Sequence, residues 1–224
     1  LALANIVVTS RPIDNLTATA RYRYFEYQND MPFHEFSDLY VSGGTTRVAA
    51  ETKNPGYTTQ SAGFELGWRP IRTLSLKGGY EYAYWRRSNF GEITDPAPDA
   101  NSTFTTTENI ARFAADVTPV DWFLGRLTYT YGNRTIENYV QAPTAELPQS
   151  WKYDYAPRIR NKVDALFQFT PWETFSPSFS IGYAKDDYYQ NQFGLTSNDY
   201  FSAGTNLDWS PVPWLTVSLD YTYE

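Results

Sequence analysis

Apolar and polar residues alternate along most of this chain with a period of two, the pattern of β-strands that have one apolar face. Around residue 20, one set of alternate positions comprises Leu16, Ala18, Ala20, Tyr22 and Tyr24. The intervening positions comprise Thr17, Thr19, Arg21 and Arg23. The alternation predicts about ten antiparallel strands, at residues 1–10, 16–28, 57–69, 73–87, 104–118, 122–136, 160–170, 174–188, 199–210 and 214–224.

A proline motif recurs between pairs of these strands and predicts short turns. Its copies are SRPIDNL (10–16), WRPIRTL (68–74), VTPVDWF (117–123), FTPWETF (169–175) and WSPVPWL (209–215). The other connections are long and polar, at about 29–56, 88–103, 137–159 and 189–198. Short turns and long connections therefore alternate, which places them at opposite ends of the sheet.

The five motifs align as repeats when they are superposed on the proline. Four residues after it stand Leu16, Leu74, Phe123, Phe175 and Leu215. Twelve residues after it stand Tyr24, Tyr82, Tyr131, Tyr183 and Tyr223. The separation of eight keeps both positions on one face of a strand and spans roughly 26 Å. Tilted as strands are in a barrel, this length leaves about 20 Å along the membrane normal.

The apolar face is aliphatic or Phe in its middle and Tyr or Trp at its ends, which is typical of a strand that crosses a bilayer. A soluble sheet with one buried face is the alternative, but it has no reason to sort aromatic residues by depth or to segregate short turns from long loops. We therefore predict an outer-membrane β-barrel with a girdle of interfacial rings. The girdle comprises Tyr24, Tyr82, Tyr131, Tyr183, Tyr223, Trp68 and Trp209.

The polar face then lines the lumen, because an arginine or lysine on the lipid side would cost about 2–4 kcal/mol at the midplane. The lumen-facing residues that we predict to contact a partner are Arg21, Arg23, Lys77, Glu81, Arg112, Asp116, Arg126, Lys162 and Asp164. The inward positions are otherwise rich in Ser, Thr, Gly and Ala, which suits a wide barrel. Together with the start at Leu1 and the end at Glu224, this predicts that residues 1–224 form a single segment of a larger barrel.

Composition excludes several other classes of function. The 224 residues contain no Cys and carry a net charge of −7, so we expect no disulfide, no thiolate metal site and no nucleic-acid partner. No apolar stretch is long enough for a transmembrane helix. The single histidine, His34, has no convincing partner for hydrolytic catalysis, and we expect neither catalytic residues nor a metal or cofactor held by this chain.

The C-terminal third resembles the MtrB/PioB family of outer-membrane barrels. The resemblance is carried by RNKVD (160–164), SIGYAKDDYY (180–189), FGLT (193–196) and the closing LDWSPVPWLTVSLDYTYE (207–224). The segments LTATARYRYFEYQND (16–30) and GWRPIRTLSLKGGYEYAYWRR (67–87) are similar to strands of that family.

The resemblance implies a wide barrel in the bacterial outer membrane that sheathes a multihaem c-type cytochrome in its lumen. An extracellular cytochrome would dock at the long loops, and electrons would cross the membrane through the haem of the partners, with none bound by the barrel. The absence of a C-x-x-C-H motif agrees with this division of roles. A porin or substrate channel that uses the same lipid face is the alternative.

Overall fold

The computed structural model describes residues 1–29, 35–40, 47–51, 56–88, 104–137, 156–190 and 195–224. They form twelve β-strands. The main sheet comprises β1 (Ala2–Ile13), β2 (Leu16–Tyr27), β5 (Gly56–Ile71), β6 (Leu74–Ser88), β7 (Phe104–Val120), β8 (Phe123–Glu137), β9 (Arg158–Phe169), β10 (Phe175–Asp187), β11 (Ser197–Val212) and β12 (Leu215–Tyr223). Among the described residues, no helix has the length and apolar character needed to cross a membrane.

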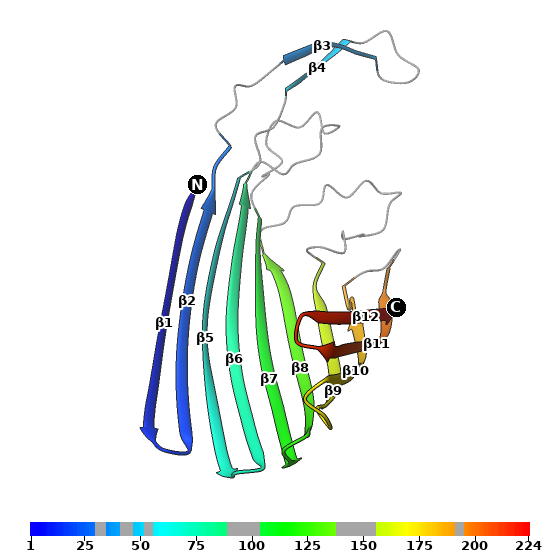
Figure 1. Cartoon of the computed structure of the whole chain (residues 1–224). Coiled ribbons are helices and arrows are strands. Elements are labelled where there is room, and N and C mark those ends of the chain that lie inside the picture. The colour runs from blue at the N-terminus through cyan, green and yellow to red at the C-terminus, as the bar shows by residue number, and fades with distance from the viewer. Residues whose placement is uncertain (30–34, 41–46, 52–55, 89–103, 138–155, 191–194) are drawn as a thin grey trace.

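The ten strands pair in sequence order as an antiparallel meander, with β1 and β12 at its two edges. Figure 1 shows them side by side, with the sheet curling from β8 towards β12. The sheet is not closed on itself within the described residues, as expected of a part of a larger barrel. The predicted ten strands are thus confirmed. Each residue four places after a motif proline, Leu16 and Phe123 among them, begins a strand.

The prolines do not occupy the turns, as the sequence suggested. Pro12, Pro70, Pro119 and Pro211 each lie one residue before the end of the incoming strand, where the pairing register shifts. Proline has no N–H to donate to the ladder, and an irregularity in the pairing accommodates it. Of the five aligned prolines, Pro171 differs in lying between strands, after the end of β9.

The residue before a proline supplies the last backbone donor of its ladder. The N–H of Arg69 donates to the carbonyl of Asn15 in the preceding turn at 2.8 Å, and the N–H of Ser210 donates to Thr174 at 2.7 Å. Equivalent bonds join Thr118 to Thr73 and Thr170 to Trp122. These hydrogen bonds join each turn to the neighbouring strand, so the repeated motif holds the turns at the short-turn end of the sheet at one level.

The apolar side chains are more exposed than the polar ones that alternate with them, which is the reverse of the pattern in a water-soluble protein. On β5, Phe64, Leu66 and Trp68 are 54%, 48% and 47% exposed, whereas the polar-face residues Glu65 and Gly67 between them are half-buried. An exposed apolar face that extends over ten strands cannot be stable in water. The sheet therefore requires an apolar medium on that side.

The polar face is the concave one, because its side chains crowd each other. A Cβ added at Gly182 would lie 2.7 Å from Ser202 Oγ, and one at Gly204 would lie 2.8 Å from Ser180 Oγ. On the apolar face, a Cβ at Gly78 would meet nothing closer than 3.7 Å. Side chains converge on the inside of a curved sheet, so the polar residues point inward.

A second, two-stranded sheet interrupts the connection predicted to run unbroken over residues 29–56. It pairs β3 (Glu35–Tyr40) with β4 (Arg47–Glu51). Aromatic and β-branched residues flanking two glycines form a hairpin signal that is too short to stand out in the sequence. His34 and most of the long connections predicted at 88–103 and 137–159 lie outside the described residues.

Candidate functional site

The inner face of the sheet carries all nine charged residues that the sequence assigns to the lumen. The strand pairing places them on one face: Arg21 and Arg23 on β2, Lys77 and Glu81 on β6, Arg112 and Asp116 on β7, Arg126 on β8, and Lys162 and Asp164 on β9. Some of these residues form ion pairs with one another and others do not, and the sequence does not show which.

Asp116 joins three strands in an ion cluster towards the short-turn end. Its carboxylate accepts hydrogen bonds from Arg126 Nε at 2.6 Å and Nη2 at 3.1 Å, and from Lys77 Nζ at 3.2 Å. The Asp116 side chain is only 12% exposed, against about 40% for its partners (39% and 42%). On β9, Lys162 and Asp164 form a pair of their own at 3.0 Å. All five of these charged groups therefore have an ionic partner within the sheet.

Replacing Asp116 by asparagine is expected to lower the free energy of unfolding by about 1–2 kcal/mol, because it leaves two cations without their carboxylate. Asp164→Asn is the control. It breaks a pair in which both side chains are about 40% exposed (38% and 40%), which is worth less than about 1 kcal/mol. Urea titration of the full protein in detergent micelles measures both. Equal losses would contradict the cluster.

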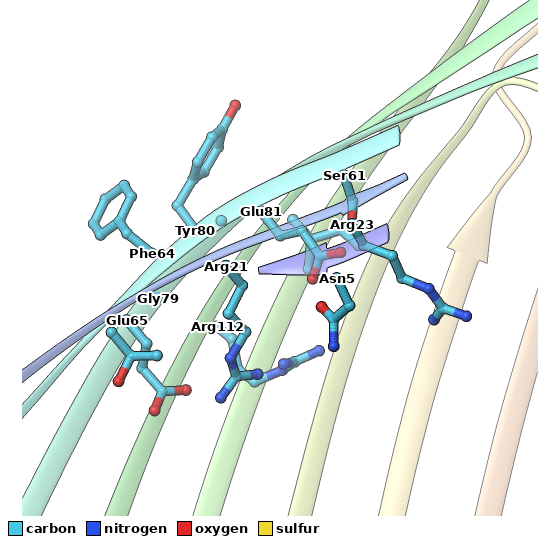
Figure 2. A pocket seen from close by; sticks show the side chains of 13 residues that line it. Asn5, Arg21, Arg23, Ser61, Phe64, Glu65, Gly79, Tyr80, Glu81 and Arg112 are labelled. Atoms are coloured by element: carbon cyan, nitrogen blue, oxygen red, sulfur yellow. The ribbon is translucent and has the colours of Figure 1, made fainter. Parts of the chain in front are cut away.

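The other four of the nine, together with Glu65 on β5, surround a hollow of about 210 Å³ on β1, β2, β5, β6 and β7. We call it the ionic hollow; its charged residues are Arg21, Arg23, Glu65, Glu81 and Arg112. Figure 2 shows these side chains, with Asn5, on one side of the sheet, while Phe64 and Tyr80 point away on the other. Among the described residues, no carboxylate oxygen lies within 4.0 Å of a guanidinium nitrogen of these three arginines.

Two glycines lie at the base of the ionic hollow. In the pairing register, Gly63 lies between Arg21 and Glu81, and Gly79 lies between Glu65 and Arg112. Because neither glycine has a side chain, opposite charges in the same row are separated by a gap. The arrangement leaves guanidinium and carboxylate groups available to something outside the chain.

The predicted girdle residues all lie on the apolar face. Tyr82, Tyr131, Tyr183 and Tyr223 are 37–58% exposed, Trp68 and Trp209 are 47% and 51% exposed, and Tyr24 is half-buried. The hydroxyl of Tyr24 donates to Glu26, and that of Tyr183 donates to Asp199, each at 2.7 Å. Polar partners thus begin on this face at the level of the tyrosines, where the apolar band ends.

A buried ionic cluster lies beyond this level on the inner face of β7 to β10, and the sequence did not predict it. Arg160 donates to both oxygens of Asp186 at 2.7 Å and 2.6 Å. Arg158 joins Asp186 at 3.2 Å to Glu108 at 3.3 Å. Arg134 Nε donates to the carbonyl of Ala156 at 2.9 Å, which fixes the entry to β9. We call these five side chains the loop-side cluster.

Burial and charge set the ionisation of the loop-side cluster, which lies beyond the apolar band. Burial, together with the nearby charge of Arg158, lowers the pKa of Arg134 to about 10. Burial alone would raise the pKa of Asp186, but the hydrogen bond from Arg160 and the surrounding arginine charges hold this pKa below its ordinary value. Arg134 and Asp186 are therefore both charged at neutral pH.

The repeat alignment contains a signal for this cluster. Arg134 and Asp186 both stand fifteen residues after their proline, which is the second inward-facing position beyond the aligned tyrosine. The equivalent positions in the first two repeats are Tyr27 and Trp85. An inward position just beyond the lipid band thus carries either a large aromatic ring or a charge that pairs across strands.

The whole chain, residues 1–224, matches the family model described as outer membrane beta-barrel porin, MtrB/PioB. The outer membrane protein MtrB of Shewanella baltica (strain OS185) is 26% identical over 229 residues, which cover 98% of this chain. The chain spans 30% of the length of that relative.

One solved structure extends the comparison. The translocator domain of the autotransporter NalP from Neisseria meningitidis matches with a TM-score of 0.47 and 10% sequence identity. The superposition covers 99% of this chain and 72% of the translocator domain.

Proposed function

This chain belongs to the MtrB/PioB family of outer-membrane β-barrel porins, and from this premise we propose that it forms part of a barrel that sheathes a multihaem c-type cytochrome. The barrel and the enclosed cytochrome together would carry electrons across the outer membrane. The haem groups belong to the cytochrome, and an extracellular cytochrome would dock where the long connections emerge.

Family membership establishes the outer membrane as the location and an antiparallel β-barrel as the fold class. The matched family is a porin family and not a class of enzymes. The apolar exterior of the sheet fits this location, because a bilayer accepts only walls whose backbone groups are paired internally.

The inner face is the observation that carries the proposal. It presents both signs of charge, and those of the ionic hollow have no ionic partner among the described residues. A protein surface with complementary charges of both signs would satisfy them and would gain specificity from the match. The barrel would separate the cytochrome from the lipid. The protein that surrounds the haem groups has a polar surface, and such a surface cannot lie directly in hydrocarbon.

A solute channel is the second candidate, favoured by the small polar residues on the inner face of β10 and β11. Ser178, Ser180, Gly182, Ser202 and Gly204 would leave room for water. In that function the charges of the ionic hollow would be hydrated and would select ions or polar solutes.

Purification of the full protein from outer membranes in mild detergent separates the two functions. We expect a haem-staining protein to co-purify in a fixed ratio, and the complex to conduct few ions across planar bilayers because its lumen is filled. Protein that carries no haem partner and conducts ions steadily would overturn the conduit and establish the channel.

A further inference from the structure

Aromatic rings lie on the inner face of β2, β5 and β6, where an open aqueous lumen would leave them in water. The ring centroids of Phe25 and Tyr57 are 5.4 Å apart, and those of Tyr27 and Tyr57 are 5.6 Å apart. In the pairing register, Phe25 and Trp85 flank Thr59. We call the space of about 320 Å³ lined by Phe25, Tyr57 and Trp85 the aromatic hollow.

The aromatic hollow is continuous with the ionic hollow. Arg23, Ser61 and Glu81 line both of them. The two hollows therefore form one surface on β2, β5, β6 and β7, with rings towards the loop side and unpaired charges towards the middle of the strands. Tyr57 is 37% exposed, so its ring is available for contact.

At several other places on the inner face, acidic groups are bound within the chain. Asp116 is held by Lys77 and Arg126, and Asp186 by Arg158 and Arg160. On β11 and β12, Asn206 donates to Asp220 and Ser218 donates to Asp208, each at 2.6 Å. Arg11, Asp14 and Arg69 line a separate hollow near the short turns, and in the middle and loop-side parts of β2 to β7 the groups available for further polar contacts lie in the two hollows.

Binding energy at protein interfaces concentrates where aromatic rings and arginines gather in pockets, and both are present here. A free anion fits the surface poorly, because Glu65 and Glu81 stand among the arginines and would repel it. A protein partner can place carboxylates against Arg21, Arg23 and Arg112, basic groups against the glutamates, and one apolar side chain among the rings.

We propose that these two hollows are the anchor point of the protein enclosed by the barrel, held by charges of both signs and by an apolar side chain that enters the aromatic hollow and contacts Phe25, Tyr57 or Trp85. This inference rests on the proposed function and deepens it. The partner thereby takes a defined orientation in the lumen, against the N-terminal strands of this sheet and not against β10 to β12.

Photo-crosslinking in the full protein tests the anchor point. Tyr57 is replaced by p-benzoylphenylalanine in one variant, and Tyr200, which the register places on the inner face of β11, is replaced in a matched control. Each variant is irradiated in outer membranes, and cross-linked product is detected by haem staining. We expect at least a fivefold higher yield from position 57.

Charge neutralisation gives a second readout that does not depend on the probe. The double variant Arg21→Gln/Arg23→Gln is compared with Asp208→Asn/Asp220→Asn, which neutralises two carboxylates that are hydrogen-bonded within β11 and β12. Heat-modifiable migration in gels reports whether each barrel is folded. We expect the first variant to retain at least tenfold less haem protein in high-salt washes, and the second to retain as much as the unmodified barrel.

The outcomes separate the two claims. If the unmodified barrel co-purifies no haem protein, the proposed function fails and the anchor point fails with it. If it co-purifies haem protein, but positions 57 and 200 cross-link equally and both double variants retain it equally, only the anchor point is overturned. The anchor point is supported if one experiment shows the stated difference and the other shows no difference in the opposite direction.

Discussion

Replacing Leu127 by arginine is expected to destabilise the folded barrel by about 2–4 kcal/mol, or to prevent its insertion, because the side chain stands in the middle of the lipid-facing surface. Leu127 lies midway between the strand start at Phe123 and the girdle residue Tyr131, and it is 54% exposed. In hydrocarbon, the guanidinium would lose its hydration without gaining a partner.

The next residue provides the matched control. Thr128 faces inward, directly opposite Asp164 in the register, so an arginine there meets a polar surface and a carboxylate. Thr128→Arg is therefore expected to change stability by less than about 1 kcal/mol. Urea unfolding of the full protein in lipid vesicles, followed by tryptophan fluorescence, measures both variants.

The same pair of variants also tests the orientation of the whole sheet. A half-exposed leucine on a water-soluble protein tolerates arginine, so a neutral Leu127→Arg would show that this face does not lie in lipid. A larger loss from Thr128→Arg than from Leu127→Arg would show that the faces are reversed.

Replacing Asp186 by asparagine is expected to cost about 3–5 kcal/mol, the second large effect, because Arg160 loses its bidentate carboxylate and the largely buried Arg158 keeps only Glu108. The Asp186 side chain is 4% exposed and binds both Arg158 and Arg160. After the substitution, Glu108 would be the remaining carboxylate of the loop-side cluster. We expect the loop-side end of β9 and β10 to loosen first.

The neighbouring Asp187→Asn is the control. Its side chain faces the other way, is 46% exposed and lies 3.6 Å from Lys185, so its loss should cost less than about 1 kcal/mol. Chemical denaturation in vesicles and proteolysis at the loop side provide the measurements. Similar losses for both variants would contradict a stabilising role of the loop-side cluster.

Acid titration adds an independent readout for Asp186. Its pKa is lower in the folded protein than in the unfolded chain. The stability it contributes is therefore present above the unfolded pKa and is lost as the pH falls through the folded pKa. This part of the acid destabilisation should disappear in Asp186→Asn and persist in Asp187→Asn.

Most of the architecture could be predicted from the sequence because the chain repeats. Five copies of the proline motif, with an apolar residue at the fourth position and tyrosine at the twelfth, locate the strand starts and the apolar face. Strand boundaries were predicted within a few residues. Antiparallel neighbours joined by short turns need no long-range information to pair, since the turn and the alternation set their register.

Other features depended on contacts that no local pattern encodes. The bond from Arg69 to Asn15 joins two different hairpins, and it lies beside the register shift within the β5–β6 hairpin that places Pro70 before the turn. The paired strands β3 and β4 were missed because their apolar segments are short.

The sequence by itself determined the fold class, the two faces of the sheet, and which charged residues point away from lipid. These properties follow from the alternation of side chains along each strand. Only the tertiary structure decided which charges are paired. Arg158 meets Glu108 across a separation of 50 residues, whereas Arg21 has no carboxylate within reach among the described residues. Pairing depends on the side chain that the curved sheet brings opposite, and glycine gaps such as Gly63 separate Arg21 from Glu81 in their common row.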